Sequence, residues 1–375
     1  MIYLDNAATS YPKPECVYAG VEDVLRKVGG NPGRSGHRLS VEAARVIFRA
    51  RESVAKLLNV RDSSRVVFTK NATEAINVAL KGLLGPGDHV VTTAFEHNSV
   101  VRTLRRLEAG GVKVTKVRGR RPDLIEPRDI EKALTGKTRL VAIVHASNVF
   151  GTIEPVSEIG ALLRKKGIPF MVDGAQSVGS IPVDVEGMDI GILAATGHKS
   201  LFGPQGTGFL YIKEGLEPPA LIDGGTGEGD DVLEIPDRLE TGTMNTPGVG
   251  GLAVGVEFIL KEGVSKIREH EKALIKELMD GLGGIRGAVI LGPPEPESRV
   301  SLVSFNMEGK SAVDVGVRLD REFSIMVRCG THCAPDAHVS AGTYPHGAIR
   351  VSPGYFNTHE DISAFLKAVS KIAKG

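Results

Sequence analysis

Short apolar segments, separated by segments with a helical pattern, constrain the fold of this chain more than any other feature. Segments such as 139–146 (RLVAIVHA) and 189–196 (DIGILAAT) are largely apolar and do not alternate polar with apolar residues. Strands of this kind are covered by helices on both faces. In the intervening segment 71–84, apolar residues recur at helical spacing: Ile76, Ala79, Leu80 and Leu83. We therefore predict a doubly wound α/β domain with strands at 65–69, 89–94, 139–146, 169–173 and 189–196.

The chain has 375 residues, which is long enough for two domains. After residues 241–251 (TGTMNTPGVGG) the pattern changes to two long helical segments, 252–263 and 264–282, and then to a second α/β set. We predict a large domain of residues 13–250. A smaller C-terminal α/β domain would comprise residues 251–375, with residues 1–12 packed on it.

Composition argues against several classes of partner. The formal net charge is only +1, which gives no indication of nucleic-acid or anionic-membrane binding. No apolar run approaches the ~20 residues needed to span a bilayer. The start MIYLDNAATS lacks the basic and apolar regions of a secretory signal. The chain has only three cysteines, Cys16, Cys329 and Cys333, and an odd number cannot all pair in disulfides. We therefore expect a cytoplasmic protein rather than a disulfide-bonded one.

A lysine stands where a predicted strand meets a glycine-rich loop. The strand ends at Thr196, His198 and Lys199 follow, and the loop contains Gly203, Gly206 and Gly208. The order of a P-loop, GxxxxGKS/T, is absent. Two interpretations remain from this segment alone: a solvated lysine in a turn, or a desolvated, nucleophilic amine of the kind that Schiff-base enzymes use.

Polar residues also follow the other predicted strands. At 71–77 (NATEAIN), Asn71 or Thr73 can cap a helix, and the small Ala72 lets a ligand approach its free N–H groups. This segment is either an ordinary cap or a phosphate seat. In 95–99 (FEHNS), which places Glu96, His97 and Asn98 after a strand, the histidine ring either satisfies a loop hydrogen bond or stacks on a planar ligand.

Two more strand ends complete the pattern. Asp173 ends one strand and Gln176 follows three residues later, while Asn148 follows another strand. An aspartate at such a position usually caps a helix. It can also hold a protonated ring nitrogen, as pyridoxal phosphate requires when it acts as an electron sink.

The C-terminal part contributes thiols and a buried cation. Cys329 and Cys333 lie near His332, His338 and His346, but the spacing is not that of a zinc knuckle, so we predict no metal site. A reactive Cys333 thiol is the alternative, with Arg328 and His332 close in sequence to favour the thiolate. For Cys329 we expect a small apolar role at a strand end rather than a second reactive thiol. Arg350 lies in an apolar strand, where a substrate carboxylate is one candidate partner.

Taken together, these residues describe one site for pyridoxal phosphate. The chain resembles the cysteine desulfurases of the class V aminotransferase group, which have the aspartate aminotransferase-like fold (fold type I). The resemblance spans nearly the whole chain and rests on these segments: YLDNAATS (3–10), NATEAIN (71–77), EHNS (96–99), SNVFGTIEP (147–155), VDGAQSVG (172–179), TGHKSLFGPQGTG (196–208), ETGTMNTPG (240–248), RCGTHCAP (328–335) and IRVSPGYFNTHED (349–361). The short segment before Cys333 resembles the second desulfurase subgroup, which includes selenocysteine lyase-like proteins. Thr331 stands where many members of that subgroup have a histidine.

The resemblance implies a role for each candidate residue. Lys199 would bind the cofactor aldehyde and move a substrate proton, His97 would stack on the ring, Asp173 would hold the ring nitrogen, and Gln176 and Asn148 would lie near the ring oxygen. The phosphate would be bound by Ala72, Thr73, Thr196 and His198, and by Thr243 of the other subunit of a homodimer. Arg350, with Asn148, would bind the substrate, and Cys333 would accept its sulfur.

The implied reaction converts L-cysteine to L-alanine and leaves a persulfide on Cys333. A protein would then accept this sulfur, for example in iron–sulfur cluster assembly. Two alternatives remain: a selenocysteine lyase or small amino-acid aminotransferase of the same class, and a non-catalytic Cys/His module that carries a metal or sulfur.

Overall fold

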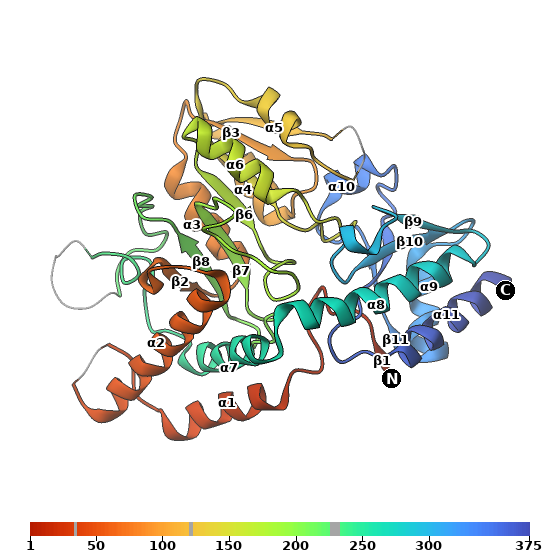
Figure 1. The fold of residues 1–375 in the computed structure, drawn as a ribbon, viewed down its shortest axis with the longest axis horizontal. Coiled ribbons are helices and arrows are strands. Elements are labelled where there is room, and N and C mark those ends of the chain that lie inside the picture. Colours follow the sequence, from red (N-terminus) through yellow and green to blue (C-terminus); the bar gives the residue numbers. More distant parts are fainter. Residues whose placement is uncertain (34–35, 120–122, 226–232) are drawn as a thin grey trace.

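A seven-stranded sheet forms the centre of the larger part of the molecule (Figure 1). The computed structural model describes residues 1–33, 36–119, 123–225 and 233–375. The strand order is β2-β8-β7-β6-β5-β3-β4. In that order the strands span Val66–Thr69, Gly208–Ile212, Ile192–Thr196, Phe170–Asp173, Thr138–Val144, His89–Thr93 and Lys113–Val117. The five predicted strands are confirmed. The sequence patterns missed β4 and also β8, which runs antiparallel to β2 and β7.

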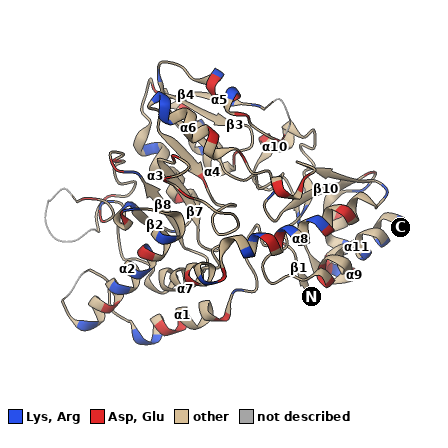
Figure 2. Cartoon of the chain, viewed as in Figure 1, with Lys and Arg blue, Asp and Glu red and all other residues tan. Residues whose placement is uncertain are grey.

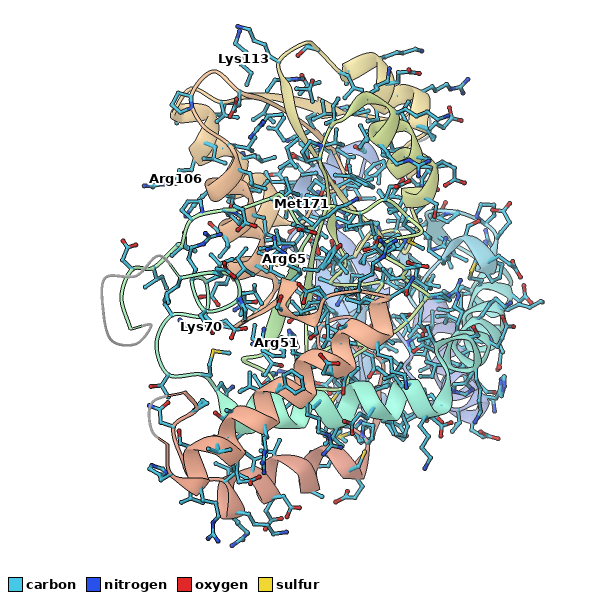
Figure 3. All side chains as sticks on the ribbon, turned by 60° about the vertical axis from the view of Figure 1, so that its left-hand side comes forward. Arg51, Arg65, Lys70, Arg106, Lys113 and Met171 are labelled. Carbon is cyan, nitrogen blue, oxygen red and sulfur yellow. The ribbon has the colours of Figure 1, made fainter. Side chains whose placement is uncertain are left out.

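Successive residues of the central strands enter two different cores. Ile143 of β5 packs into one core with α2 (Arg38–Leu58), α6 (Val156–Lys166) and α7 (Thr246–Glu262). Its neighbour Ala142 packs into the other core with α3 (Ala72–Leu83) and α4 (Asn98–Ala109). Met171 of β6 also belongs to this second core and lies inside the molecule (Figure 3). Burial on both faces explains why these strands are apolar throughout.

A second sheet forms the smaller part, with strand order β12-β13-β10-β9 and antiparallel pairing throughout. Its strands span Arg328–Gly330, Ala348–Val351, Val303–Met307 and Ala288–Leu291. The helices α8 (Val264–Gly283), α9 (Ala312–Phe323) and α11 (His359–Lys374) share its core. Strand β1 (Ile2–Tyr3) pairs with β11 (Ile325–Met326), and both chain ends lie beside this part (Figure 1).

Three further helices are α1, α5 and α10. The helix α1 (Glu15–Lys27) packs with α2 and α7, and the three lie together in Figure 1. The helices α5 (Pro127–Ala133) and α10 (Pro335–Ser340) lie near the edge strand β4 and after Cys333, respectively. In the part of the chain that the structure describes, no helix is long and apolar enough to cross a membrane.

The predicted domain boundary at residue 250 falls inside α7. Val256 and Ile259, which lie beyond that boundary, belong to the core of the larger part. The next helix, α8, packs instead on β9 and β10. Because Gly263 separates the two helices, we infer that the smaller unit begins there.

Close packing at Gly208 connects the sheet to the start of α3. A Cβ atom on this residue would lie 2.7 Å from the Asn71 Cα atom and 2.8 Å from the Ala195 carbonyl oxygen. We expect Gly208→Ala to lower the free energy of unfolding by about 1–3 kcal/mol, because backbone on both sides must move. Urea denaturation measures this loss. Gly136→Ala is the matched control, since a Cβ there meets nothing within 4 Å. Equal effects of the two substitutions would contradict this account of the close packing between Gly208 and the start of α3.

Candidate active site

A cavity of about 200 Å³ lies where the carboxyl ends of β5, β6 and β7 face the start of α3. Parallel strands place the residues that follow them at one edge of the sheet, which is where ligands bind in such folds. The cavity is lined by Asn71, Ala72, Thr73, His97, Ser99, Val144, Asn148, Asp173, Ala175, Gln176, Thr196, His198 and Lys199. The structure thus brings together every residue predicted to bind the cofactor except Thr243.

Lys199 follows β7 in a tight turn. The Gly203 N–H donates to the Gly197 carbonyl at 2.7 Å, and a Cβ on Gly203 would lie only 3.0 Å from that oxygen. Burial lowers the pKa of Lys199 to about 8, with further lowering from the charges of Arg350 and Arg328, while Asp173 opposes the shift. A lysine with this pKa is neutral near pH 7 far more often than a solvated lysine, and the neutral amine is the nucleophilic form.

Asp173 ends β6 and is only 4% exposed. One of its oxygens accepts the Ala175 N–H at 3.0 Å, so the carboxyl group is fixed in the cavity wall. Burial raises its pKa, and the charge of Lys199 counteracts this. A buried carboxylate of this kind is stabilised by a cationic partner such as a protonated ring nitrogen. Gln176, from the turn that follows, donates to the Ala7 carbonyl at 3.0 Å.

The start of α3 has the features of a phosphate seat. Asn71 caps the helix by accepting the Glu74 N–H at 2.9 Å, so Thr73 is not needed for the cap. The first N–H groups of a helix point at whatever lies before it and favour an anion. His198 lines the same cavity, and its buried Nδ1 has no hydrogen-bond partner among the described residues. This orphaned atom and the α3 terminus fit a phosphorylated cofactor, with Thr196 beside them.

His97 lines the cavity and caps the helix α4. Its Nδ1 accepts the Ser99 N–H at 3.1 Å and lies 2.8 Å from the Ser99 hydroxyl. Burial lowers the pKa of His97 to about 4, and the charge of Lys199 adds to this effect. Because Nδ1 accepts a proton, the neutral ring carries its own proton on Nε2. Such a neutral ring in a fixed orientation is suited to stacking on a planar ligand.

Arg350 is buried in β13, and its anionic partner within the chain is Asp5. Its Nη2 donates to Asp5 Oδ1 at 2.8 Å and its Nη1 donates to the Asn148 carbonyl at 3.2 Å. The Nε atom is buried and has no partner among the described residues. The sequence analysis missed Asp5, although it lies in the YLDNAATS segment.

Cys333 lies in the wall of a second cavity, of about 420 Å³, which shares Thr73, His97 and Ser99 with the first. Both His332 and Cys333 have left-handed backbone conformations, with φ values of 49° and 60°. The strained turn is held by Asn148, whose Nδ2 donates to the His332 carbonyl at 2.5 Å, and by Asn98, whose N–H donates to the Cys333 carbonyl at 2.8 Å.

A cation lies directly beside the Cys333 thiol. Arg328 Nη2 donates to Cys333 Sγ at 3.4 Å. His332 was also predicted to favour the thiolate, and this part of the prediction is wrong. Its Nε2 lies 3.3 Å from the Arg328 carbonyl, and burial lowers its pKa to about 2, so the ring is uncharged and adds no positive charge.

The remaining candidates lie away from these cavities. Cys329 packs against α9, since a Cβ on Gly316 would lie 2.4 Å from its Sγ, and burial raises its pKa to about 11. This agrees with an apolar role. The described residues contain no cluster of His, Cys, Asp and Glu that could hold a metal ion. Thr243 is exposed, and its hydroxyl accepts from Asn31 Nδ2 at 3.4 Å. Its role in a second subunit stays a prediction.

The sheet and its cavity place this chain in the class of pyridoxal-phosphate-dependent enzymes of fold type I. The chain belongs to the class-V aminotransferase family, whose model matches residues 2–365. A probable cysteine desulfurase of Methanothermobacter thermautotrophicus is 35% identical, with 99% of this chain and 94% of that protein covered. One of Pyrococcus abyssi is 36% identical, with 100% and 94% covered. The apo structure of the cysteine desulfurase from Thermococcus onnurineus NA1 superposes with a TM-score of 0.94 at 35% identity, covering 100% of this chain and 95% of that one.

Family membership confirms the predicted fold and the predicted cofactor. The cavity fits this cofactor, because it contains an anion-binding helix terminus, the fixed imidazole ring of His97, the buried carboxyl group of Asp173 and the Lys199 amine, whose pKa is lowered.

Glu96 lies directly before His97 and is completely buried. One of its oxygens accepts the Thr93 hydroxyl at 2.7 Å and the Val144 N–H at 3.0 Å, while the other has no partner among the described residues. Burial raises its pKa from 4.5 to about 8, and the charge of Asp173 adds to the shift. At pH 7 this pKa keeps the Glu96 carboxyl group mostly protonated.

The raised pKa of Glu96 predicts a pH dependence of stability. A carboxyl group with a folded-state pKa above its unfolded value contributes stability below the unfolded pKa and loses it as pH rises through the folded one. Between pH 4.5 and about 8, we expect the free energy of unfolding of Glu96→Gln to decline less steeply than that of the unaltered protein. Urea unfolding at pH 5 and pH 8 measures both slopes. Identical slopes would show that Glu96 ionises normally in the folded state.

Proposed function

We propose that this chain is a cysteine desulfurase, which removes sulfur from L-cysteine and leaves L-alanine and a persulfide on Cys333. One observation carries the proposal: the thiol of Cys333, beside Arg328, lies in a cavity that shares His97 with the cavity of Lys199 and Asp173. The relatives named cysteine desulfurase, which match over nearly their whole length, support it.

The bound cofactor supplies the electron sink for the bond changes at the substrate carbons. Asp173 would hold its ring nitrogen, and Lys199 would hold its aldehyde. The neutral Lys199 amine then takes the proton from the substrate Cα, which its lowered pKa favours. His97, fixed by Ser99, keeps the ring plane in position.

Two groups act on the ends of the substrate. Arg350 binds the substrate carboxylate in place of Asp5 and uses its free Nε as a further donor. The Cys333 thiolate attacks the substrate sulfur. An S–S bond forms as the Cβ–S bond breaks, and the carbon keeps the electron pair and takes up a proton to become the methyl group of L-alanine. No external oxidant or reductant is needed.

The shared site of a homodimer is part of the proposal. The helix α2 exposes Leu39, Val41 and Phe48, with exposed fractions of 40%, 41% and 61%. Phe48 lines a cavity of about 700 Å³ together with Gly242 and Met244, the neighbours of Thr243. An apolar surface beside that threonine is what a second copy would cover.

Three free cysteines among the described residues fit a cytoplasmic setting.

Substitution of the two reactive residues tests the function. With L-cysteine and dithiothreitol, we expect the protein to release sulfide and L-alanine. Lys199→Ala should lose turnover and bind the cofactor only loosely. Cys333→Ser should lose sulfide release yet keep the absorbance of the bound cofactor, because its defect falls after cofactor binding.

Cys329→Ser is the matched control and should retain most of the rate. Alkylation after addition of L-cysteine, followed by mass spectrometry, locates the persulfide. A persulfide on Cys329, or full activity in Cys333→Ser, would show that the thiol has been wrongly assigned. Turnover of L-selenocysteine but not of L-cysteine would instead identify a selenocysteine lyase.

Thr243 tests the shared site. We expect a homodimer in analytical ultracentrifugation, and we expect Thr243→Ala to weaken cofactor binding about tenfold, as for the loss of one hydrogen bond to a charged group. Thr241→Ala, two residues away, should bind the cofactor normally. A monomer that binds the cofactor and turns over at the full rate would contradict the shared site.

A further inference from the structure

Three cations line the cavity that holds Cys333. Lys81 comes from α3, and Arg102 and Arg106 come from α4. Because the two arginines are four residues apart on a helix, they lie on the same face. The described residues that line this cavity include no aspartate or glutamate. We call Lys81, Arg102 and Arg106 the basic groove.

The basic groove contrasts with several helices of the surface, because no aspartate or glutamate lines it among the described residues. On α8 and along α1 and α2, cationic and anionic residues are interspersed (Figure 2). Many surface cations are paired, for example Lys276 with Asp280. Within the part of the chain that the structure describes, no ion pair involves a residue of the basic groove. Arg106 projects outward from α4 at the edge of the molecule (Figure 3). Unpaired cations around a cavity concentrate and orient an anionic partner.

The length of the groove indicates the size of that partner. Asn98, the first residue of α4, donates to the Cys333 carbonyl, and Arg106 lies eight residues further along the helix. At a helical rise of ~1.5 Å per residue this separation is about 12 Å. A small thiol beside Cys333 is too short to contact Arg106 as well, whereas an extended peptide segment can contact both.

We propose that the basic groove binds an acidic segment of the protein that accepts sulfur from Cys333. This inference rests on the proposed function, which requires a persulfide to be handed on. The acceptor thiolate attacks the outer sulfur of the Cys333 persulfide, and a new S–S bond forms on the acceptor. The bond to the Cys333 sulfur breaks, and Cys333 leaves as a thiolate beside Arg328. The acceptor gains the sulfur, and no electrons enter or leave the pair.

Synthetic peptides with a single cysteine test the groove directly. The cysteine is flanked by four aspartates, four serines or four lysines, and the holoenzyme is first loaded with L-cysteine and then freed of it. Mass spectrometry follows persulfide transfer to each peptide. At low ionic strength we expect the acidic peptide to react at least about tenfold faster than the basic one, and this ratio should shrink at high salt.

Variants connect the preference to the groove. We expect Lys81→Gln, Arg102→Gln and Arg106→Gln, combined in one protein, to bring the acidic and basic peptides to nearly equal rates. Arg105→Gln is the matched control, because Arg105 is an exposed arginine of the same helix that is not part of the cavity wall. It should keep the preference. Equal rates for all three peptides with the unaltered protein, or a preference that survives the triple substitution, would overturn the inference.

Two further measurements separate this inference from the proposed function. With dithiothreitol, a small neutral acceptor, L-alanine formation should be the same in the triple variant and the unaltered protein. If the unaltered protein forms no L-alanine at all, the proposed function fails. The groove is then judged by the reaction of Cys333 with a dianionic aromatic disulfide and a neutral one, mapped by mass spectrometry. A selective slowing of the anionic reagent in the triple variant would support the groove, and no slowing would refute it.

Discussion

Burial of the central sheet on both faces is the constraint on which the rest of the structure depends. Every apolar residue of β6 and β7 belongs to one core or the other, so the polar residues of these strands lie only at their ends. These ends meet at one edge, because the strands run parallel there. Asp173 and Lys199 thus come together although 26 positions separate them in the sequence. The cavity is a direct consequence of how the sheet hides its apolar residues.

Asn148 connects this cavity with the smaller part of the molecule. Its side chain donates to the His332 carbonyl, and its own carbonyl accepts from Arg350. The turn that carries Cys333 and the strand that carries Arg350 are therefore both fixed to a residue of the larger part. A rotation of the smaller unit away from the sheet would break both hydrogen bonds at once. The proposed thiol and the proposed carboxylate site are accordingly positioned by the same residue, one through its side chain and the other through its main chain.

Local patterns were sufficient to predict the features that depend on neighbouring residues. The apolar runs located five strands, and the lysine after Thr196 was found from its strand and glycines. The pairing of Asp5 with Arg350 joins positions 345 apart, which no local pattern encodes. The neutral state of His332 depends on burial by the folded chain, so its proximity to Cys333 in the sequence was misleading. The strand β8 was missed altogether, and its antiparallel direction is not encoded locally either, because an apolar strand has the same composition in either orientation.

Electrostatics gives the site its character. Burial is the main cause of the low pKa of His97. The charges of Lys199, Arg328 and Arg350 lower this pKa further. The same two arginines, Arg328 and Arg350, lower the pKa of Lys199, because like charges close together repel one another. Asp173 and Asp5 offset only part of this charge. A cavity with excess positive charge favours ligands that bring their own anions. A phosphate at α3, a carboxylate at Arg350 and a thiolate at Arg328 would each neutralise a different part of that excess.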